Sequence, residues 1–536
     1  MNWRSAQGVD AMTMTLQRRD WLKFGAATGL AWTGLQEAMA QGLGAAAFAS
    51  GAPELLPLQG LRGQDLDARD LQIEGRLPDG LRGTYYRNGP GLMARGEERY
   101  RHWFDGDGLV QAWTFGGSAG RGQVAHKARF VQTRKFKAEA EAGRFLLPAF
   151  GTAIPPRMPI QNSDSLNVAN TSVILLNGRL HALWEGGSAY ELDPQTLATR
   201  GPRVWSPELA GMPFSAHPKV EPDGTVWNFG TAGDRMAVYQ ISARGQVVRS
   251  EVFESPVPVP MVHDFAMSQR FLVFLLPPIQ LDMAAVRGGQ SMLDSMRWQA
   301  QDSTRVLVID KADFSRRRVF EVPASLVFHF GNAWDEGAAG AETLHLDYVE
   351  SRPLPQANAE LQQVMRGERP APQSSQPRFM RLQMGAAAPG AAGVQPSAPG
   401  RISVQSRSES VEFPVVDPRV VGQRHRHVYY PTAVDLGPRW GYNGLMHLDL
   451  ETGRRERFAF GPEVVLEEHV LVPKPGTPQG AAGEGQGWLL GLGYDCRRQR
   501  SFASVFDAQA LSAGPLARVW LPYWVTYGFH GKFYAA

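Results

Sequence analysis

Four histidines of this 536-residue chain share a setting that its other eight histidines lack. Each has an apolar or aromatic residue nearby and a small or turn-forming residue just after it. They occur in the strings Phe214-Ser-Ala-His217-Pro, Met261-Val-His263-Asp-Phe, Val327-Phe-His329-Phe-Gly and Tyr527-Gly-Phe-His530-Gly. Neutral imidazole binds zinc, copper, nickel and iron alike. The four are therefore either the ligands of one metal ion or ordinary core and surface side chains.

The spacing of these histidines favours a shared site only if the chain is built from repeated units. The gaps between them are 46, 66 and 201 residues. In a β-propeller the innermost strands of all blades surround one axis, so equivalent side chains from different blades converge there. Without such blades the four scattered histidines prove nothing.

Beyond residue 75 the sequence is typical of strands and tight turns, with short apolar or alternating runs broken by Gly, Asp, Asn and Pro. The clearest example is the predicted hairpin 171–185, with Asn177-Gly178 as its turn. A loose repeat of about 63 residues fits propeller blades with long loops. Its markers are the run ends Leu192-Asp193, Ile241-Ser242, Ile309-Asp310, Leu448-Asp449 and Phe506-Asp507, with one copy missing before the fourth. We therefore predict an all-β, seven-bladed β-propeller over 75–536.

Two segments within that range depart from the strand pattern. The apolar positions of 282–299 predict a helix. Residues 367–400 are rich in Pro, Ala, Gly and Ser, which predicts a flexible insertion without chemistry.

The first 40 residues are typical of a twin-arginine export signal. Arg18-Arg19 is followed by an apolar run of about 12 residues, too short to span a membrane, and by Ala38-Met39-Ala40. An amphipathic helix is the alternative. The signal predicts a periplasmic or membrane-peripheral protein, and 41–74 would then be an N-terminal extension.

Composition excludes some classes of protein. The net charge of +3 argues against a nucleic-acid partner. Cys496 is the only cysteine, so no disulfide can form within the chain. We expect a monomer.

Six strings in order resemble the carotenoid cleavage oxygenase family. They are Tyr86-Arg-Asn-Gly-Pro90, His102-Trp-Phe-Asp-Gly-Asp-Gly108, Ala216-His-Pro218, Val262-His-Asp-Phe265, Phe328-His-Phe-Gly-Asn-Ala333 and Tyr527-Gly-Phe-His-Gly531. The resemblance implies a seven-bladed propeller whose long loops and few short helices form a cap over one axial Fe(II) per chain. It also implies that the iron is bound by the four histidines, without a carboxylate ligand.

The same resemblance implies three glutamates behind the ligands: Glu185 with His263, Glu412 with His329, and Glu468 with His530. Glu467 stands beside Glu468 and competes for that role. A carboxylate that accepts the far ring N–H fixes the tautomer and orientation of the ring and raises its basicity. Surface or strand-edge carboxylates are the alternative interpretation.

The resemblance further implies oxidative cleavage of a conjugated carbon-carbon double bond by O2, giving two carbonyl products. Trp184 and Phe328 match positions that line an apolar substrate tunnel, although either could be a plain core aromatic. Stilbene-cleaving members tend to carry Lys at the position of Trp184, so we expect an apolar carotenoid or apocarotenoid rather than a stilbene. Some members isomerise retinoid esters instead. Segment 281–298 is the candidate for membrane contact at the tunnel mouth.

Two other classes of protein fit parts of this pattern. One is a periplasmic ligand-binding propeller whose histidines bind structural zinc or lie in the core. The other is a propeller hydrolase, which would need a carboxylate pair at its centre. Metal content separates the oxygenase from the binding protein.

Overall fold

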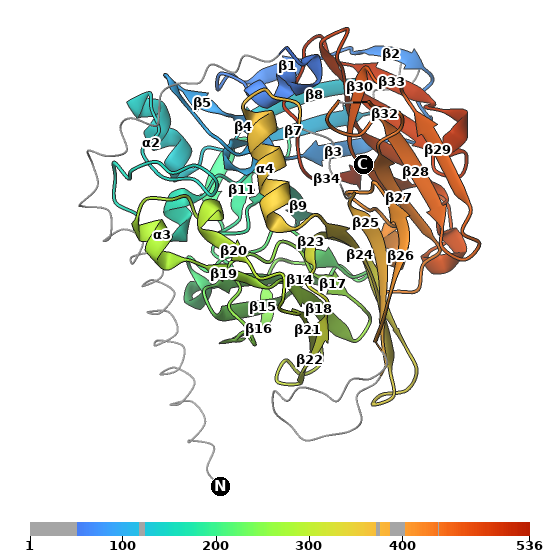
Figure 1. Ribbon diagram of the computed structural model, residues 1–536. Coiled ribbons are helices and arrows are strands. Elements are labelled where there is room, and N and C mark those ends of the chain that lie inside the picture. Colours follow the sequence, from blue (N-terminus) through green and yellow to red (C-terminus); the bar gives the residue numbers. More distant parts are fainter. Residues whose placement is uncertain (1–50, 117–123, 371–375, 386–401, 438) are drawn as a thin grey trace.

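The computed structural model describes residues 51–116, 124–370, 376–385, 402–437 and 439–536 (Figure 1). The predicted export signal, 1–40, lies outside these residues. The described chain forms seven antiparallel sheets of three to six strands, with two further two-stranded ribbons. These sheets are the blades of a β-propeller, so the predicted all-β, seven-bladed fold is confirmed.

The strands of the seven blades and the two ribbons have the following bounds. Blade one contains β1 (Leu66–Ala68), β3 (Gly83–Arg87), β4 (Pro90–Leu92), β7 (Asp107–Phe115), β8 (Val124–Phe130) and β34 (Gly531–Ala535). Blade two contains β9 (Ser172–Leu176), β10 (Arg179–Leu183), β11 (Tyr190–Leu192) and β12 (Thr199–Pro202), and blade three contains β13 (Lys219–Val220), β14 (Val226–Ala232), β15 (Arg235–Ile241) and β16 (Val247–Glu254). Blade four contains β17 (Ala266–Met267), β18 (Phe271–Leu276), β21 (Thr304–Asp310) and β22 (Arg317–Val322), and blade five contains β23 (Leu326–Glu336), β24 (Thr343–Ser351), β25 (Arg378–Met384) and β26 (Ile402–Glu409). Blade six contains β27 (His427–Thr432), β28 (Gly444–Asp449) and β29 (Arg455–Ala459), and blade seven contains β2 (Gln72–Gly75), β30 (Val464–Pro473), β31 (Gly487–Asp495), β32 (Arg500–Asp507) and β33 (Ala517–Trp520). The ribbons are β5 (Ala94–Arg95) with β6 (Glu98–Arg99), and β19 (Ile279–Leu281) with β20 (Met296–Trp298).

The ring is closed by strands from both ends of the described chain. The C-terminal strand β34 joins blade one by pairing with β3, where Arg87 lies opposite Gly531. The N-terminal strand β2 joins blade seven by pairing with β33, and β1 joins blade one by pairing with β8. The predicted boundary at residue 75 is therefore too late, because strands from within 41–74 belong to two blades. Both strands are short edge strands with few apolar residues, so they carry little strand signal.

Local turn chemistry and apolar runs explain why these strands form. Asn177 and Gly178 both have positive φ, 49° and 71°, as a two-residue hairpin turn between β9 and β10 requires. The predicted hairpin is thus confirmed. Every residue of β18 is buried, as in a strand covered on both faces. The core lies between neighbouring blades, where residues of one sheet pack against those of the next.

Helices among the described residues are few and short, as predicted. They are α2 (Arg134–Ala142), α3 (Met283–Arg287) and α4 (Leu354–Met365), with the 3-10 turns η1 (Pro53–Gln59), η2 (Trp103–Asp105), η3 (Ser163–Leu166), η4 (Pro207–Leu209), η5 (Leu293–Ser295), η6 (Pro418–Val420), η7 (Gly480–Gly483) and η8 (Leu511–Ala513). Figure 1 shows α4 lying across the strands rather than within a blade. Residues of η2, η3, α3 and α4 line one large cavity, so these elements form its cap.

The predicted helix over 282–299 is wrong. Helix α3 ends at Arg287, and the chain continues through η5 into β20, which pairs with β19. The reason is Gly288-Gly289, where Gly289 has a φ of 95° that ends a helix. No helix of the described chain is long and apolar enough to cross a membrane.

The predicted flexible insertion over 367–400 is wrong in part. Residues Arg378–Met384 form β25, the third strand of blade five, paired with both β24 and β26. Phe379, Met380, Leu382 and Met384 of this strand are buried. A short apolar strand was thus concealed by the Pro, Ala and Gly residues on either side. Residues 371–375 and 386–401 lie outside the described residues.

Candidate metal centre

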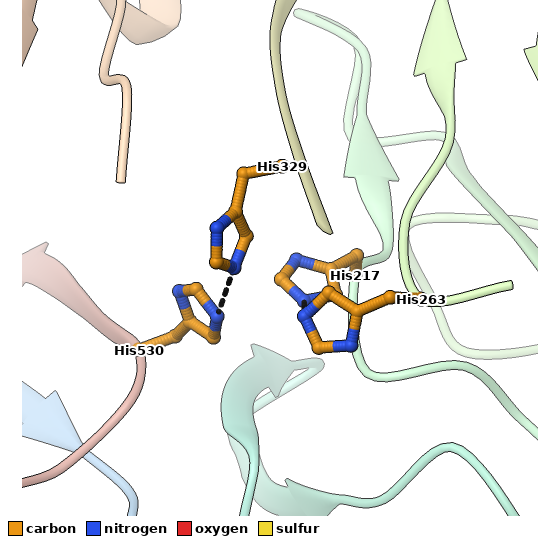
Figure 2. A group of neighbouring side chains, drawn as sticks. All are labelled: His217, His263, His329 and His530. Atoms are coloured by element: carbon orange, nitrogen blue, oxygen red, sulfur yellow. Dashed lines mark hydrogen bonds between the residues drawn. The ribbon is translucent and has the colours of Figure 1, made fainter. Parts of the chain in front are cut away.

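The four histidines with a common sequence setting come together from four blades. His217 and His263 lie shortly before β13 and β17. His329 lies within β23, and His530 directly precedes β34. One ring nitrogen from each lies within 4.8 Å of all the others. Figure 2 shows the four rings turned toward a common point.

The ring nitrogens that face this point are Nε2 atoms. The Nε2 atoms of His217 and His263 are 2.8 Å apart, and those of His329 and His530 are 3.1 Å apart. Burial and the neighbouring imidazoles lower the pKa of His217 well below its usual value. Burial also lowers the pKa of His530 to about 4. At neutral pH these two rings are therefore uncharged, as metal binding requires.

Two glutamates hold the outer nitrogens of neighbouring rings. Glu185 accepts a hydrogen bond from Nδ1 of His263, and Glu412 accepts one from Nδ1 of His329. Burial acts to lower the pKa of His329, but the charge and hydrogen bond of Glu412 outweigh it, so that this pKa is raised. With Nδ1 as the donor, Nε2 of each ring keeps a free lone pair.

Glu468, not Glu467, holds the fourth ring. The Oε1 atom of Glu468 lies 2.9 Å from Nδ1 of His530, and its Oε2 accepts a hydrogen bond of 2.8 Å from the amide of Gly531. Glu467 instead pairs with Arg87. The pairing register of β30 shifts between Leu466 and His469, and this bulge lets two consecutive glutamates serve different partners. The three His–Glu contacts are those that the family resemblance implied.

No glutamate of the described residues hydrogen-bonds to His217, which instead has Asp264 beside it. Nδ1 of His217 lies 3.9 Å from Oδ1 of Asp264, too far for a direct hydrogen bond. The same oxygen lies 2.8 Å from Nζ of Lys219, and Oδ2 accepts a hydrogen bond of 3.2 Å from the amide of Phe330. Asp264 thus ties together the segments that carry His217, His263 and His329. Sequence reasoning missed this role, although Asp264 lies in one of the family strings.

Replacing Asp264 by Asn should weaken metal binding by roughly tenfold, the lower end of the loss seen when a group behind a metal ligand is removed. The charge that holds Lys219 is lost, while the size of the side chain is kept. Metal affinity is measured by competition with a chelator of known affinity. Asp335→Asn is the matched control, because Asp335 is also buried in an ion pair, with Arg270. Equal affinities in the two variants would contradict the role of Asp264.

A cavity of about 700 Å³ opens beside the four histidines. Three of them, all but His217, line its wall. Both predicted tunnel residues, Trp184 and Phe328, also line it. Much of the remaining wall is apolar and includes Phe104, Phe150, Ile160, Met212, Met261, Met292 and Phe529. The size and lining suit a small apolar molecule.

Comparison with known proteins identifies the family of the chain. The family described as "Retinal pigment epithelial membrane protein" matches residues 62–535. Apocarotenoid-15,15'-oxygenase of Synechocystis sp. is 29% identical over 88% of this chain and 94% of its own length. Isoeugenol monooxygenase of Pseudomonas putida is 29% identical over 86% of this chain and 94% of its own length.

A solved structure agrees with these relatives. The crystal structure of cobalt-substituted Synechocystis ACO superposes with a TM-score of 0.77 at 27% identity, covering 90% of this chain and 99% of that one. The fold and the cluster of four histidines are those of a class of β-propeller oxygenases with a single metal site. The chain belongs to the family of the retinal pigment epithelial membrane protein and the carotenoid oxygenases.

Proposed function

We propose that the protein is a non-haem Fe(II) dioxygenase that cleaves a conjugated carbon-carbon double bond of a carotenoid or apocarotenoid. One alkene and one O2 give two carbonyl products, so the reaction balances without an added reductant. The observation that carries the proposal is the convergence of four imidazole Nε2 atoms beside an apolar cavity. The similarity to apocarotenoid-15,15'-oxygenase supports the choice of substrate class.

The donor set fits ferrous iron. Four imidazoles, three of them held by carboxylates, would bind one Fe(II) per chain without a carboxylate ligand. When bound, the iron supplies the electron chemistry that makes O2 reactive toward an alkene. The carboxylates of Glu185, Glu412 and Glu468 offset its charge in a buried site.

The residues of the cavity account for the rest of the proposed reaction. Trp184 and Phe328 present flat apolar surfaces to the cavity, and the ring centroid of Phe328 lies 5.5 Å from that of His263. Such walls align an extended conjugated chain and exclude water from the reacting bond. Trp184 has no charge to offer a phenol, which favours a polyene over a stilbene. A stilbene is the alternative substrate.

The decisive experiment reconstitutes the purified chain with ferrous iron and supplies O2 with three kinds of substrate in parallel. These are apocarotenals, full-length carotenoids and hydroxystilbenes. We expect an aldehyde product that depends on O2, and its mass identifies the cleaved bond. Absence of such a product from every substrate would contradict the proposed cleavage, and turnover of stilbenes alone would contradict the substrate class. A zinc-containing protein without O2 uptake would support a ligand-binding propeller.

The cellular location is also a proposal. The twin-arginine motif supports export to the periplasm, and fractionation of cells that express the full chain tests it.

Segment 281–298 is our candidate for membrane contact, yet none of its large apolar side chains is among the exposed ones. Binding to lipid vesicles tests that contact, and sedimentation tests whether the protein is a monomer.

A further inference from the structure

The two sides of the cavity differ in polarity. The wall from blades two to four presents mainly aromatic, aliphatic and methionine side chains. The wall from blades five and six carries more polar side chains. Among them are Ser351, Arg352, Glu360, Gln376, Ser410, Glu412, Arg439 and Tyr442. An entirely apolar substrate would leave the hydroxyl of Tyr442 in this group without a hydrogen-bond partner, at a cost in free energy.

Arg352 and Glu360 form an ion pair within this polar group. Arg352 follows β24, and its guanidinium donates to the carboxylate of Glu360 on α4. The guanidinium also donates a hydrogen bond of 3.2 Å to Oε1 of Gln376. The side chains of Arg352 and Glu360 keep only 15% and 16% of their surface exposed. Their charges balance, so this part of the wall is polar but neutral.

Tyr442 brings a hydroxyl group to the same wall. Tyr442 lines the cavity, and among the described residues its hydroxyl has no hydrogen-bond partner. The charges of Glu412, Arg352 and Glu360 all reach it. Burial raises the pKa of Tyr442 far above its usual value. The phenol is therefore neutral and free to donate a hydrogen bond into the cavity.

We propose that Tyr442, Arg352 and Glu360 form a binding subsite for a neutral hydroxyl group at one end of the substrate. A hydroxyl both accepts and donates hydrogen bonds, so it can accept from Tyr442 and donate to Glu360. A carboxylate end group would find both arginines of this wall already paired, Arg352 with Glu360 and Arg439 with Glu463. It would also face Glu412 nearby. The proposal deepens the proposed function and rests on it for the identity of the substrate as a conjugated alkene.

The test compares the wild type with Tyr442→Phe, which removes only the free hydroxyl. Metal-free protein is titrated with a ring-hydroxylated apocarotenal and with the same apocarotenal lacking the hydroxyl, and Kd is read from quenching of tryptophan fluorescence. We expect Kd for the hydroxylated probe to rise about three- to tenfold in the variant, the size of one hydrogen bond. The other probe should bind both proteins equally. Tyr523→Phe, outside the cavity, is the matched control and should change neither Kd.

Equal changes for both probes, or no change for either, would overturn the subsite. A second pair of probes, 4-hydroxystilbene and its methyl ether, tests whether the hydroxyl belongs to a stilbene or to an apocarotenoid. The class of substrate is the one for which the free hydroxyl lowers Kd more. Turnover by the iron-loaded wild type is assayed separately. Hydroxyl preference without any turnover would support the subsite and contradict the proposed function. Turnover without a hydroxyl preference would support the proposed function and contradict the subsite.

Discussion

Replacing His329 by Ala is expected to abolish metal binding and with it the cleavage activity. The substitution removes one of the four imidazoles that meet at the centre and leaves Glu412 without the ring that it holds. Losing a group behind a ligand already lowers metal affinity or activity about 10- to 100-fold, so loss of the ligand itself should lower activity by more than 100-fold. Metal content by elemental analysis and O2 uptake after loading with ferrous iron measure both effects.

The matched control for this experiment is His345→Ala. His345 stacks on Trp334 with ring centroids 4.6 Å apart and belongs to the same blade, but it is not part of the centre. This variant should retain its iron and its activity. If His329→Ala retained one iron per chain, the four imidazoles would not be the binding site.

The repeat in the sequence predicts the blades because its markers are the ends of strands, where an apolar run is followed by a turn. Four of its markers close β11, β15, β21 and β32. Each is the third strand in the pairing order of its sheet, counted from β9, β13, β17 and β30 respectively. The missing copy falls in blade five, whose third strand is β25. That strand was concealed within the segment predicted to be an insertion. Composition averaged over a window thus obscured a short strand that alternation along Arg378–Met384 does indicate.

The ligands and their partners differ in how far sequence could predict them. The strings around the histidines are local, so the resemblance could identify them. The choice between Glu467 and Glu468 depends on a bulge in β30, and a one-residue shift reverses the side to which a strand residue points. Local pattern gives no sign of such a bulge. Asp264 and Tyr442 act through residues on other blades, so only the assembled ring reveals their contacts.

Beside the metal centre, Arg87 and Glu467 form a buried ion pair that joins β3 to β30 and so helps to close the ring. The Arg87 side chain is fully buried, and Glu467 is 6% exposed. Arg87 also donates a hydrogen bond of 3.3 Å to the hydroxyl of Tyr85. Glu467 also accepts a hydrogen bond of 2.6 Å from the amide of Gly528. Burial raises the pKa of Glu467 even though Arg87 acts to lower it.

Replacing Arg87 by Met should lower the free energy of unfolding by about 3–5 kcal/mol, because it leaves a buried carboxylate unpaired. Without Arg87 the folded-state pKa of Glu467 rises further above its unfolded value. The unfolded chain then releases the proton first as pH rises, so the variant loses stability progressively above about pH 4.5. Urea denaturation at pH 5 and pH 7 should therefore show the larger deficit at pH 7. The double variant Arg87→Met with Glu467→Gln removes the charge and should recover much of the loss. A deficit that is independent of pH and unchanged in the double variant would show that lost packing, not the unpaired charge, destabilises the ring.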